Sequence, residues 1–283
     1  MRTESSAGGI LERRIPKSGE PVPALGLGTW QAFDVGGDTR ETSEAKDALK
    51  LFVELGGRVI DSSPMYGSAE SVTGRLAAEL GAQPKLFVAT KVWTSGKQAG
   101  IRQMEESMKR LRVQRLDLMQ VHNLVDVQTQ LATLRDWKAA GRIRYLGVTH
   151  YHAGAHAELE KLVGRGDIDT VQINYSLAEP EAERRLLGAA AGSGTAVIVN
   201  RPFAEGAIFG RAKGLPLPSF AKEIGCASWG QFFLKWILAH PAVTCVIPGT
   251  RNAGHVADNL GAGSGPLPDE AMRRRMADHF NSL

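Results

Sequence analysis

Apolar segments rich in branched residues alternate with amphipathic stretches along nearly the whole chain, and this alternation restricts the fold more than any other feature. The apolar segments predict eight strands, at residues 24–28, 58–61, 86–90, 116–121, 145–149, 170–174, 196–200 and 243–247. The amphipathic stretches predict eight helices, at residues 44–55, 69–80, 101–111, 127–140, 155–163, 181–191, 228–239 and 253–260. Because a helix follows each strand, we expect parallel strands joined by crossover helices.

Eight such units predict an α/β fold, a single (β/α)8 TIM barrel. A chain of 283 residues is long enough for two average domains or for one barrel of this kind. No linker rich in Pro or Ser separates the units, so we expect one domain over residues 1–283, with about residues 1–9 disordered. Residues 10–15 and 21–24 flank Lys17-Ser18-Gly19-Glu20 and predict an N-terminal β-hairpin at the barrel floor.

The composition excludes several other classes of protein. The 32 glycines lack the three-residue period of collagen, and no apolar run approaches the roughly 20 residues of a membrane-spanning helix. The first residues contain no apolar stretch typical of a secretion signal. Cys226 and Cys245 lack zinc-site spacing, and Cys245 is expected to be a buried reduced thiol. Together these features predict a cytoplasmic protein without a membrane partner.

The charge pattern points to a small-molecule partner. A formal net charge of +4 is compatible with an anionic ligand. No block of Lys and Arg with interleaved aromatic residues indicates a nucleic-acid surface. The run Arg273-Arg274-Arg275 is expected to form the solvated face of a C-terminal helix. We therefore expect no nucleic-acid partner, and a monomer or weak homo-oligomer.

Four polar residues follow predicted strands: Asp61, Tyr66 five positions later, Lys91 and His122. The carboxyl ends of the strands of a barrel meet at one mouth, so these side chains are expected to converge. Taken singly, Asp61, Tyr66 and His122 could be capping, loop or strand-end residues. Lys91 is different, because an ammonium directly after an apolar strand needs a carboxylate partner, which Asp61 can supply.

Together the four residues predict an acid catalyst. A phenol is a poor proton donor at neutral pH, and we expect the ammonium of Lys91 to lower the pKa of Tyr66. Asp61 would hold Lys91 in place, and the imidazole of His122 would donate to a carbonyl oxygen and orient it. This combination is suited to delivering a proton to oxygen while a hydride arrives at carbon.

Several segments occur in an order that resembles the aldo-keto reductase family, and the resemblance covers about residues 20–262. They are Gly26-Leu27-Gly28-Thr29-Trp30, Ile60-Asp61-Ser62-Ser63, Met65-Tyr66-Gly67, Thr90-Lys91-Val92, Gln120-Val121-His122-Asn123, Gly147-Val148-Thr149, Val171-Gln172-Ile173-Asn174-Tyr175 and Ile247-Pro248-Gly249-Thr250-Arg251. The resemblance implies that Asp61, Tyr66, Lys91 and His122 are catalytic, with Tyr66 as proton donor in the reduction of an aldehyde or ketone to an alcohol.

The resemblance also implies a nicotinamide cofactor, bound across the barrel mouth without a Rossmann fold, and Arg251 favours NADPH rather than NADH. The sequence agrees, since it has no Gly-x-Gly-x-x-Gly segment opening a strand–helix unit. The implied cofactor contacts are Gly28, Thr29, Trp30, Asp61, Thr149, His150, Gln172, Asn200, Arg201, Pro202, Phe203, Pro248, Gly249, Thr250, Arg251, His255, Asp258 and Asn259.

The sequence departs from the family pattern in this region. Thr149-His150 stands where many members have Ser-Asn, and Asn200 stands where many have a tyrosine that stacks on the nicotinamide ring. Arg201 could stack in its place, contact the pyrophosphate or serve the structure alone. Arg251, with no acidic residue from 248 to 257, favours a 2′-phosphate; the alternative is that Arg251 pairs with Asp258 or Glu270.

Substrate contacts are expected from Trp30, Tyr66, Trp93, His122 and Asn123. Aromatic walls favour a small-molecule carbonyl with an apolar or aromatic body, although both tryptophans could instead be packing residues. Residues 201–218 are expected to form a mobile loop, and the short segment after the last predicted helix suggests a shallow pocket.

Three other functions were weighed. A non-catalytic NADP(H)-binding sensor or subunit on the same barrel remains an alternative, and the missing stacking aromatic favours it. A short-chain reductase would need Tyr-x-x-x-Lys, which does not occur. A metal-dependent hydrolase would need clustered ligands, and His122, His150 and His152 are too few and too scattered, so no metal is expected.

Overall fold

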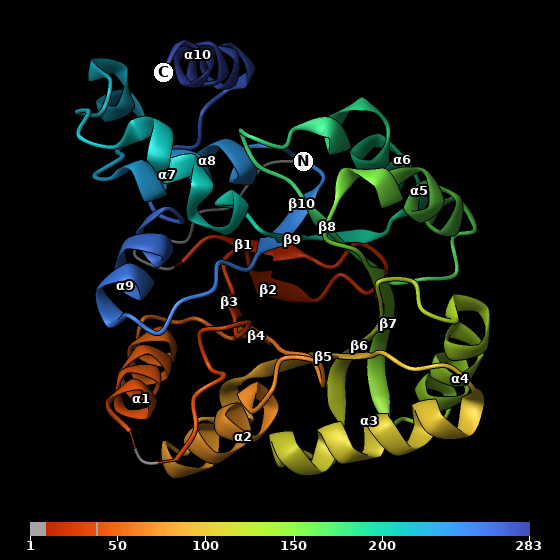
Figure 1. Ribbon diagram of the computed structural model, residues 1–283. Coiled ribbons are helices and arrows are strands. Elements are labelled where there is room, and N and C mark those ends of the chain that lie inside the picture. The colour runs from red at the N-terminus through yellow and green to blue at the C-terminus, as the bar shows by residue number, and fades with distance from the viewer. Residues whose placement is uncertain (1–9, 38) are drawn as a thin grey trace.

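The computed structural model describes residues 10–37 and 39–283, so the expectation for residues 1–9 lies outside the described residues. Eight parallel strands follow one another around the sheet in chain order (Figure 1). They are β3 (Leu27–Gly28), β4 (Val59–Asp61), β5 (Phe87–Val92), β6 (Leu116–His122), β7 (Ile143–Thr149), β8 (Thr170–Asn174), β9 (Ala196–Asn200) and β10 (Val243–Val246). Each pair of neighbours is parallel, as the sequence predicted.

The first and last strands meet and close the barrel. Parallel bridges join Leu25 to Val246 and Gly28 to Gly249, and the amide of Gly26 donates to the carbonyl of Val246 at 2.8 Å. A Cβ on Gly28 would lie 2.9 Å from the carbonyl oxygen of Ile247, so only glycine allows this approach. The predicted (β/α)8 barrel is therefore confirmed, and the Gly-Leu-Gly segment has a structural role in closing it.

The helices lie outside the strands (Figure 1). They are α1 (Arg40–Glu54), α2 (Ala69–Glu79), α3 (Lys97–Leu111), α4 (Val127–Ala139), α5 (His156–Gly164), α6 (Leu186–Ser193), α7 (Ala207–Ala212), α8 (Trp229–Leu238), α9 (Ala253–Gly261) and α10 (Glu270–Ser282). Short 3-10 helices add η1 (Gln83–Lys85), η2 (Ala153–Ala155), η3 (Glu181–Arg184), η4 (Ala204–Gly206) and η5 (Ser219–Ile224).

Four helical predictions need correction, and one of them is α3, which begins at Lys97 and not at residue 101. α1 begins four residues before the predicted start, because the Thr39 hydroxyl caps it by accepting from the amide of Thr42. The helix predicted at 181–191 is instead η3 and α6, separated by Arg185 with non-helical φ and ψ of −149° and −45°. The loop predicted at 201–218 contains η4 and α7.

The barrel interior has an apolar core separate from the larger one between strands and helices. It comprises Ile15, Val22, Val59, Phe87, Ala89, Leu118, Tyr145, Ala196, Ile198, Cys245 and Ile247. Ile15 and Val22 come from the antiparallel hairpin of β1 (Glu12–Arg14) and β2 (Pro21–Pro23), so the predicted hairpin at the floor is confirmed. Cys226 and Cys245 are both buried free thiols.

Polar contacts fasten this hairpin to the barrel. The Arg144 guanidinium pairs with Glu20, which also accepts from the Tyr145 hydroxyl at 2.5 Å. Arg13 donates to carbonyls that follow α8, including that of Val243 at 2.9 Å. These contacts explain how so short a hairpin holds a fixed position across the floor.

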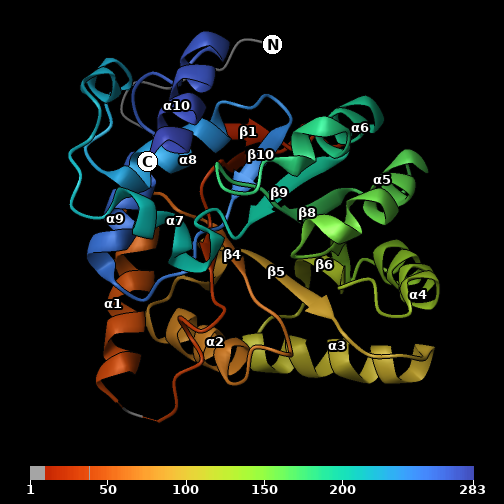
Figure 2. The ribbon, with the colours of Figure 1, turned by 45° about the horizontal axis from the view of Figure 1, so that its top comes forward.

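At the C-terminus, α10 packs on α8 (Figure 2). Arg273 is only 14% exposed in its side chain, bonds the Tyr175 hydroxyl at 2.7 Å and Glu183 at 2.5 Å, and lies over the Trp236 ring. The expected solvated face is therefore wrong for Arg273, because α10 needs this residue to dock on the barrel. Arg274, with a side chain 65% exposed, fits the expectation.

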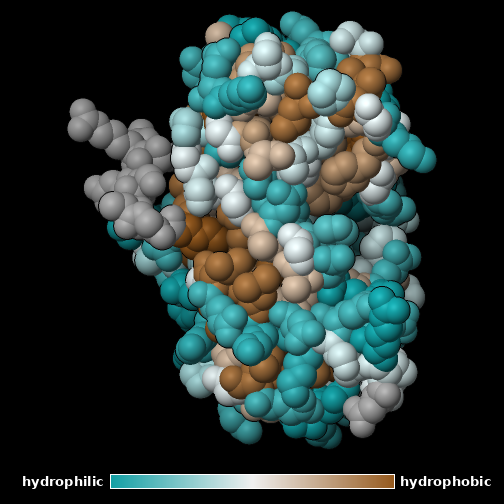
Figure 3. Space-filling model, turned by 90° about the vertical axis from the view of Figure 1, so that its left-hand side faces the viewer, coloured by the Kyte–Doolittle hydropathy of each residue, from teal (hydrophilic) through white to brown (hydrophobic). Residues whose placement is uncertain are grey.

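The outer face that carries α1 and α9 is mostly hydrophilic, with hydrophobic side chains gathered in separate patches (Figure 3). Within the described ranges, no helix combines the length and the apolar character needed to cross a bilayer.

Candidate active site

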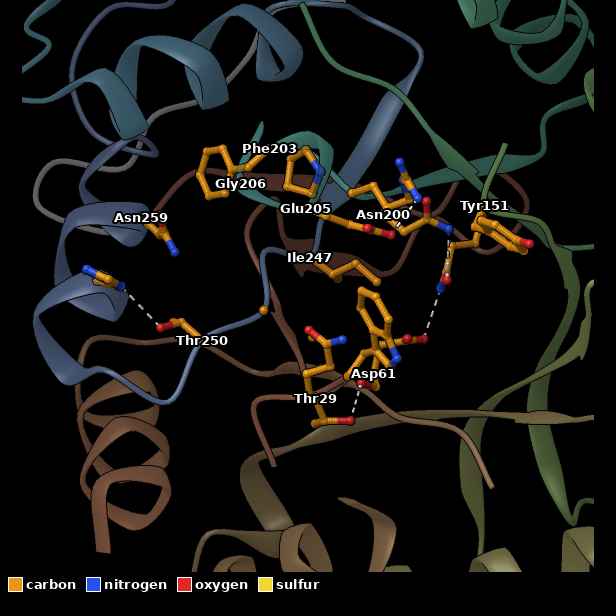
Figure 4. A pocket seen from close by; sticks show the side chains of 18 of the residues that line it. Thr29, Asp61, Tyr151, Asn200, Phe203, Glu205, Gly206, Ile247, Thr250 and Asn259 are labelled. Carbon is orange, nitrogen blue, oxygen red and sulfur yellow. Dashed lines mark hydrogen bonds and ion pairs between the residues drawn. The ribbon is translucent and has the colours of Figure 1, made fainter. Parts of the chain in front are cut away.

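A pocket of about 920 Å³ opens where the strands end. Thr250 and Asn259 lie at one end of it and Asn200 and Tyr151 at the other, with Asp61 and Thr29 between them (Figure 4). The predicted site residues that line the pocket are Gly28, Thr29, Trp30, Asp61, Tyr66, His122, Asn123, Thr149, Gln172, Asn200, Arg201, Pro202, Phe203, Gly249, Thr250, His255, Asp258 and Asn259. The structure thus brings most of the predicted residues together.

Five predicted residues do not line the pocket: Lys91, Trp93, His150, Pro248 and Arg251. Ten residues outside the set of predicted site residues also line it: Gln31, Met65, Tyr151, Glu205, Gly206, Phe209, Ser228, Trp229, Gly230 and Ile247. Many of these belong to the segments that carry α7 and the start of α8. The short apolar turns around α7 gave no strong signal in the sequence.

Lys91 lies beneath the pocket and is completely buried. Its ammonium pairs with Asp61, donates to the carbonyl of Ser62 at 2.7 Å and lies 4.9 Å from the centre of the Tyr66 ring. The expected carboxylate partner is therefore in place. β4 supplies Asp61, β5 supplies Lys91, and the loop before α2 supplies Tyr66.

Asp61 is itself held by side chains from the far side of the barrel. One carboxylate oxygen accepts from the amide groups of Gln172 at 2.9 Å and Gln120 at 3.2 Å. The other oxygen is left to Lys91. Both carboxylate oxygens of Asp61 therefore have hydrogen-bond partners inside the barrel.

The ion pair of Lys91 with Asp61 and the phenol of Tyr66 change one another's pKa values. Burial alone lowers the pKa of Lys91, but Asp61 and Tyr66 raise it more, so the net change is upward and Lys91 stays charged. Burial also raises the pKa of Tyr66, and the charge of Lys91 opposes that rise without cancelling it. The predicted net lowering of the Tyr66 pKa is therefore wrong. Tyr66 is therefore protonated at neutral pH, with the charge of Lys91 beside its ring.

His122 faces the same pocket as a neutral imidazole. Burial, with smaller contributions from Lys91 and His150, lowers its pKa to about 2. Its Nδ1 lies 2.9 Å from the hydroxyl of Ser63, which already accepts from the amide of Met65. A Ser63 hydroxyl that donates its hydrogen to Nδ1 would leave the imidazole proton on Nε2.

At one end of the pocket, three polar side chains come together from neighbouring strands. The Thr149 hydroxyl donates to the Gln172 carbonyl oxygen at 3.1 Å, and the Asn200 amide donates to the backbone carbonyl of His150 at 3.1 Å. The His150 ring stacks on Tyr151 and its Nδ1 accepts from the Tyr151 amide at 2.9 Å. His150 is therefore turned away from the pocket, and Tyr151 lines it instead.

Arg201 lies on the pocket wall between two carboxylates, Glu179 at 3.1 Å and Glu205 at 2.6 Å. Its φ of +48° is in the left-handed region, as are the φ values of Ala204 and Glu205. Of the roles weighed for Arg201, ion pairing that fixes this strained turn is the one that its contacts support.

Arg251, at the other end, lies against α1. It donates to Glu41 at 3.1 Å and to Glu44 at 3.3 Å, whereas the predicted alternative partners, Asp258 and Glu270, are wrong. Asp258 instead accepts from the Ser228 hydroxyl at 2.6 Å. Thr250 and His255 carry the polar character of the pocket at this end.

Among the residues described here, no three His, Cys, Asp or Glu side chains form a cluster that could hold a metal ion.

The chain was then compared with known proteins. The model of the aldo/keto reductase family matches residues 24–277. Methylglyoxal reductase YeaE of Escherichia coli (strain K12) is 32% identical, over 88% of this chain and 89% of that protein. An aldo/keto reductase from Klebsiella pneumoniae, solved in complex with NADP and acetate, is 25% identical with a TM-score of 0.76 and 93% coverage of both chains.

A thermostable aldo-keto reductase, Tm1743, solved with the inhibitor epalrestat, has a TM-score of 0.79 at 25% identity, covering 96% of this chain and all of that one. Sequence and fold therefore agree over nearly the whole length of the described barrel. The chain belongs to the aldo/keto reductase family.

Proposed function

We propose that the protein reduces an aldehyde or ketone to an alcohol with NADPH, and that Tyr66 donates the proton. Membership of the family supports the general reaction. The observation that carries the assignment of Tyr66 is the ion pair of Lys91 with Asp61, buried beneath the Tyr66 ring at the base of the pocket. An isolated tyrosine on a pocket wall would not need a completely buried cation beside it.

The pocket residues fit a nicotinamide dinucleotide. Asn123 Oδ1, Asn200 Oδ1 and Arg201 Nε are buried polar atoms of the pocket wall without a hydrogen-bond partner among the described residues. Such unpaired atoms suit a ligand that brings its own amide and anionic groups. In this proposal the carboxamide end of the cofactor is held by Thr149, Gln172 and Asn200. The adenosine end is held by Thr250 and His255. NADP bound to the Klebsiella relative supports the choice.

The cofactor, when bound, supplies a hydride to the carbonyl carbon. His122 donates from Nε2 to the substrate oxygen and holds it beside Tyr66. Tyr66 then transfers its hydroxyl proton to that oxygen, and Lys91 stabilises the resulting phenolate. Asp61, fixed by Gln120 and Gln172, keeps Lys91 charged and in place.

The walls near Tyr66 suit a carbonyl with an apolar or aromatic body. Trp30, Met65 and Tyr151 are exposed large side chains that face the pocket, whereas Trp93 is exposed outside it. Trp93 is thus left out of the proposed substrate contacts, and Tyr151 joins Trp30 and Asn123. The name of the Escherichia coli relative makes methylglyoxal the first compound to try.

The test is a panel of carbonyls followed by NADPH absorbance, containing methylglyoxal and benzaldehydes of increasing size. We expect turnover of at least one aldehyde. NADPH binding without turnover of any member would instead support the non-catalytic sensor, which the absence of an aromatic at Asn200 favours.

Three further expectations belong to the same proposal: one domain over residues 1–283, a cytoplasmic location, and a monomer or weak homo-oligomer. Sedimentation of the purified chain measures the last of these directly.

A further inference from the structure

A carboxyl group is buried behind the proposed catalytic pair, and the mechanism does not use it. Glu70 lies in the first turn of α2, four residues after Tyr66, and is fully buried. One of its oxygens accepts from the Thr90 hydroxyl at 2.6 Å. Thr90 directly precedes Lys91 on β5. A single hydrogen bond thus joins the helix that follows Tyr66 to the strand that carries Lys91.

The backbone transmits this connection to Tyr66. The amide of Ala69, the first residue of α2, donates to the Tyr66 carbonyl at 3.0 Å, so Tyr66 belongs to the turn that enters the helix. On the outer side, Asp34 accepts from the amide and hydroxyl of Ser68 at 2.8 and 2.9 Å. Glu70 is the corresponding attachment on the inner side. A shift of α2 against β5 would therefore shift Tyr66 against Lys91.

The charges around both groups are few and identified. Arg110 of α3 lies 3.7 Å from the second oxygen of Glu70, the Ser107 hydroxyl of α3 lowers the pKa of Glu70, and Lys91 acts on Glu70 from β5. Tyr66 is faced by Lys91, Asp61 and His122. Burial raises the pKa of Glu70. Burial of a carboxyl group costs free energy, so we expect Glu70 to have a role at this junction.

We propose that Glu70 is a positioning residue, whose hydrogen bond to Thr90 fixes Tyr66 at its working distance from Lys91. This inference rests on the proposed function of Tyr66 and adds the residue that aligns it. Alignment errors of about 1 Å reduce turnover by up to roughly 100-fold, so the loss of one such bond is measurable.

The experiment compares Thr90→Val, which removes the hydroxyl at constant shape, with Glu70→Gln and Thr90→Ser, which both keep the hydrogen bond. Thr73→Val is the matched control, because Thr73 is a buried threonine one turn further along α2 whose hydroxyl has no hydrogen-bond partner among the described residues. We expect kcat to fall between about 10-fold and 100-fold in Thr90→Val, with NADP+ affinity within about 2-fold of wild type. The conservative variants and Thr73→Val should keep most of kcat.

A second readout is independent of turnover. Ultraviolet titration of each protein, taken as a difference from the same protein with Tyr66→Phe, follows ionisation of Tyr66 alone. We expect the titration to move to higher pH in Thr90→Val, because the phenolate is further from Lys91.

An unchanged kcat and unchanged Tyr66 titration in Thr90→Val would overturn the inference, and so would equal losses in Thr90→Val and Thr73→Val. If the wild type turned over no carbonyl, the proposed function would be wrong. The positioning role of Glu70 would still be tested, since the titration reports the position of Tyr66 without turnover. Should Thr90→Val not fold, a kcat loss in both Glu70→Gln and Thr90→Ser would contradict the positioning role.

Discussion

The floor and the mouth of the barrel are built from the same strands and differ in chemistry. On β5, Phe87 and Ala89 belong to the interior apolar core, and Lys91 follows two positions later. On β9, Ala196 and Ile198 belong to that core and Asn200 reaches the pocket. Because inward side chains recur every second residue, these two strands change from apolar to polar toward the mouth. The floor is therefore an apolar region, and the mouth is the polar region to which the proposed function assigns the chemistry.

The two ends also differ in backbone strain and in buried polar atoms without a hydrogen-bond partner. The floor is closed by a hairpin that Glu20 and Arg13 fasten to the barrel, with Arg13 Nε as its one buried side-chain atom without a hydrogen-bond partner among the described residues. The mouth keeps unpaired buried atoms and a left-handed turn at Arg201, Ala204 and Glu205. Functional sites commonly carry such costs, and a well-packed region elsewhere offsets them. Substitutions at the two ends should separate activity from stability.

The largest effect is expected at the mouth, for Lys91→Met. Removing the ammonium leaves Asp61 buried and unpaired and takes away the charge that stabilises the phenolate. We expect kcat to fall by about 10³-fold and the free energy of unfolding by roughly 3–5 kcal/mol. Steady-state kinetics and urea denaturation measure the two quantities. A variant that retained wild-type kcat would show that the buried pair has no part in turnover.

The corresponding break at the floor is Ile15→Ala. Ile15 is 3% exposed and closes the interior core, so its truncation should reduce the free energy of unfolding by roughly 2–5 kcal/mol. Values of kcat and KM below the unfolding transition should match those of wild type. A fall in kcat without loss of stability would mean that the floor and the mouth are coupled.

A pH experiment sharpens the comparison through His122. Its pKa in the folded protein is about 2, against an ordinary 6.5, because burial disfavours the imidazolium. The unfolded chain binds this proton below pH 6.5 and the folded protein does not, so stability falls as the pH drops from about 6.5 toward 2. His122→Gln should lose less stability between pH 7 and 4 than wild type does.

The floor provides the control for that measurement. Ile15→Ala should lower the unfolding free energy by the same amount at pH 7 and pH 4, since neither residue titrates. Parallel pH dependences for wild type and His122→Gln would contradict the buried neutral state of His122.

The smallest effect is expected at the rim of the mouth, for Arg251→Ala. We expect the ratio of kcat/KM for NADPH to that for NADH to fall by roughly 10-fold, near the lower limit for a charge-assisted contact. Glu41 and Glu44 compete for the guanidinium, and solvent screens it. Equal ratios in wild type and variant would show that Arg251 does not recognise the 2′-phosphate.

The sequence predicted what depends on periodicity and on ordered motifs. Alternating apolar segments located the barrel strands, and strand ends located Asp61, Lys91 and His122, because parallel strands must bring their carboxyl ends together. The pairing of Lys91 with Asp61 followed from the cost of burying a lone charge. These inferences need only local patterns and the geometry of one fold.

Other features depend on contacts between distant segments. Arg251 pairs with Glu41 and Glu44, about 210 positions earlier in the chain, and only the packing of α1 against α9 reveals this. His150 turns away from the pocket because its ring stacks on the ring of Tyr151 and its Nδ1 accepts a hydrogen bond from the Tyr151 amide. A periodic sequence pattern does not predict the rotamer of His150. It also does not predict that Trp93 lies exposed outside the pocket.

Turnover by Tyr66→Phe is the most direct test of the claim that the mouth supplies the proton. The substitution removes one hydroxyl, keeps the ring beside His122 and leaves the floor untouched. With a substrate from the carbonyl panel, we expect kcat to fall by about 10²-fold or more while NADPH affinity and unfolding free energy stay close to wild type. Retention of near wild-type kcat, with NADPH consumed at the normal rate, would contradict the assignment of Tyr66 as the donor.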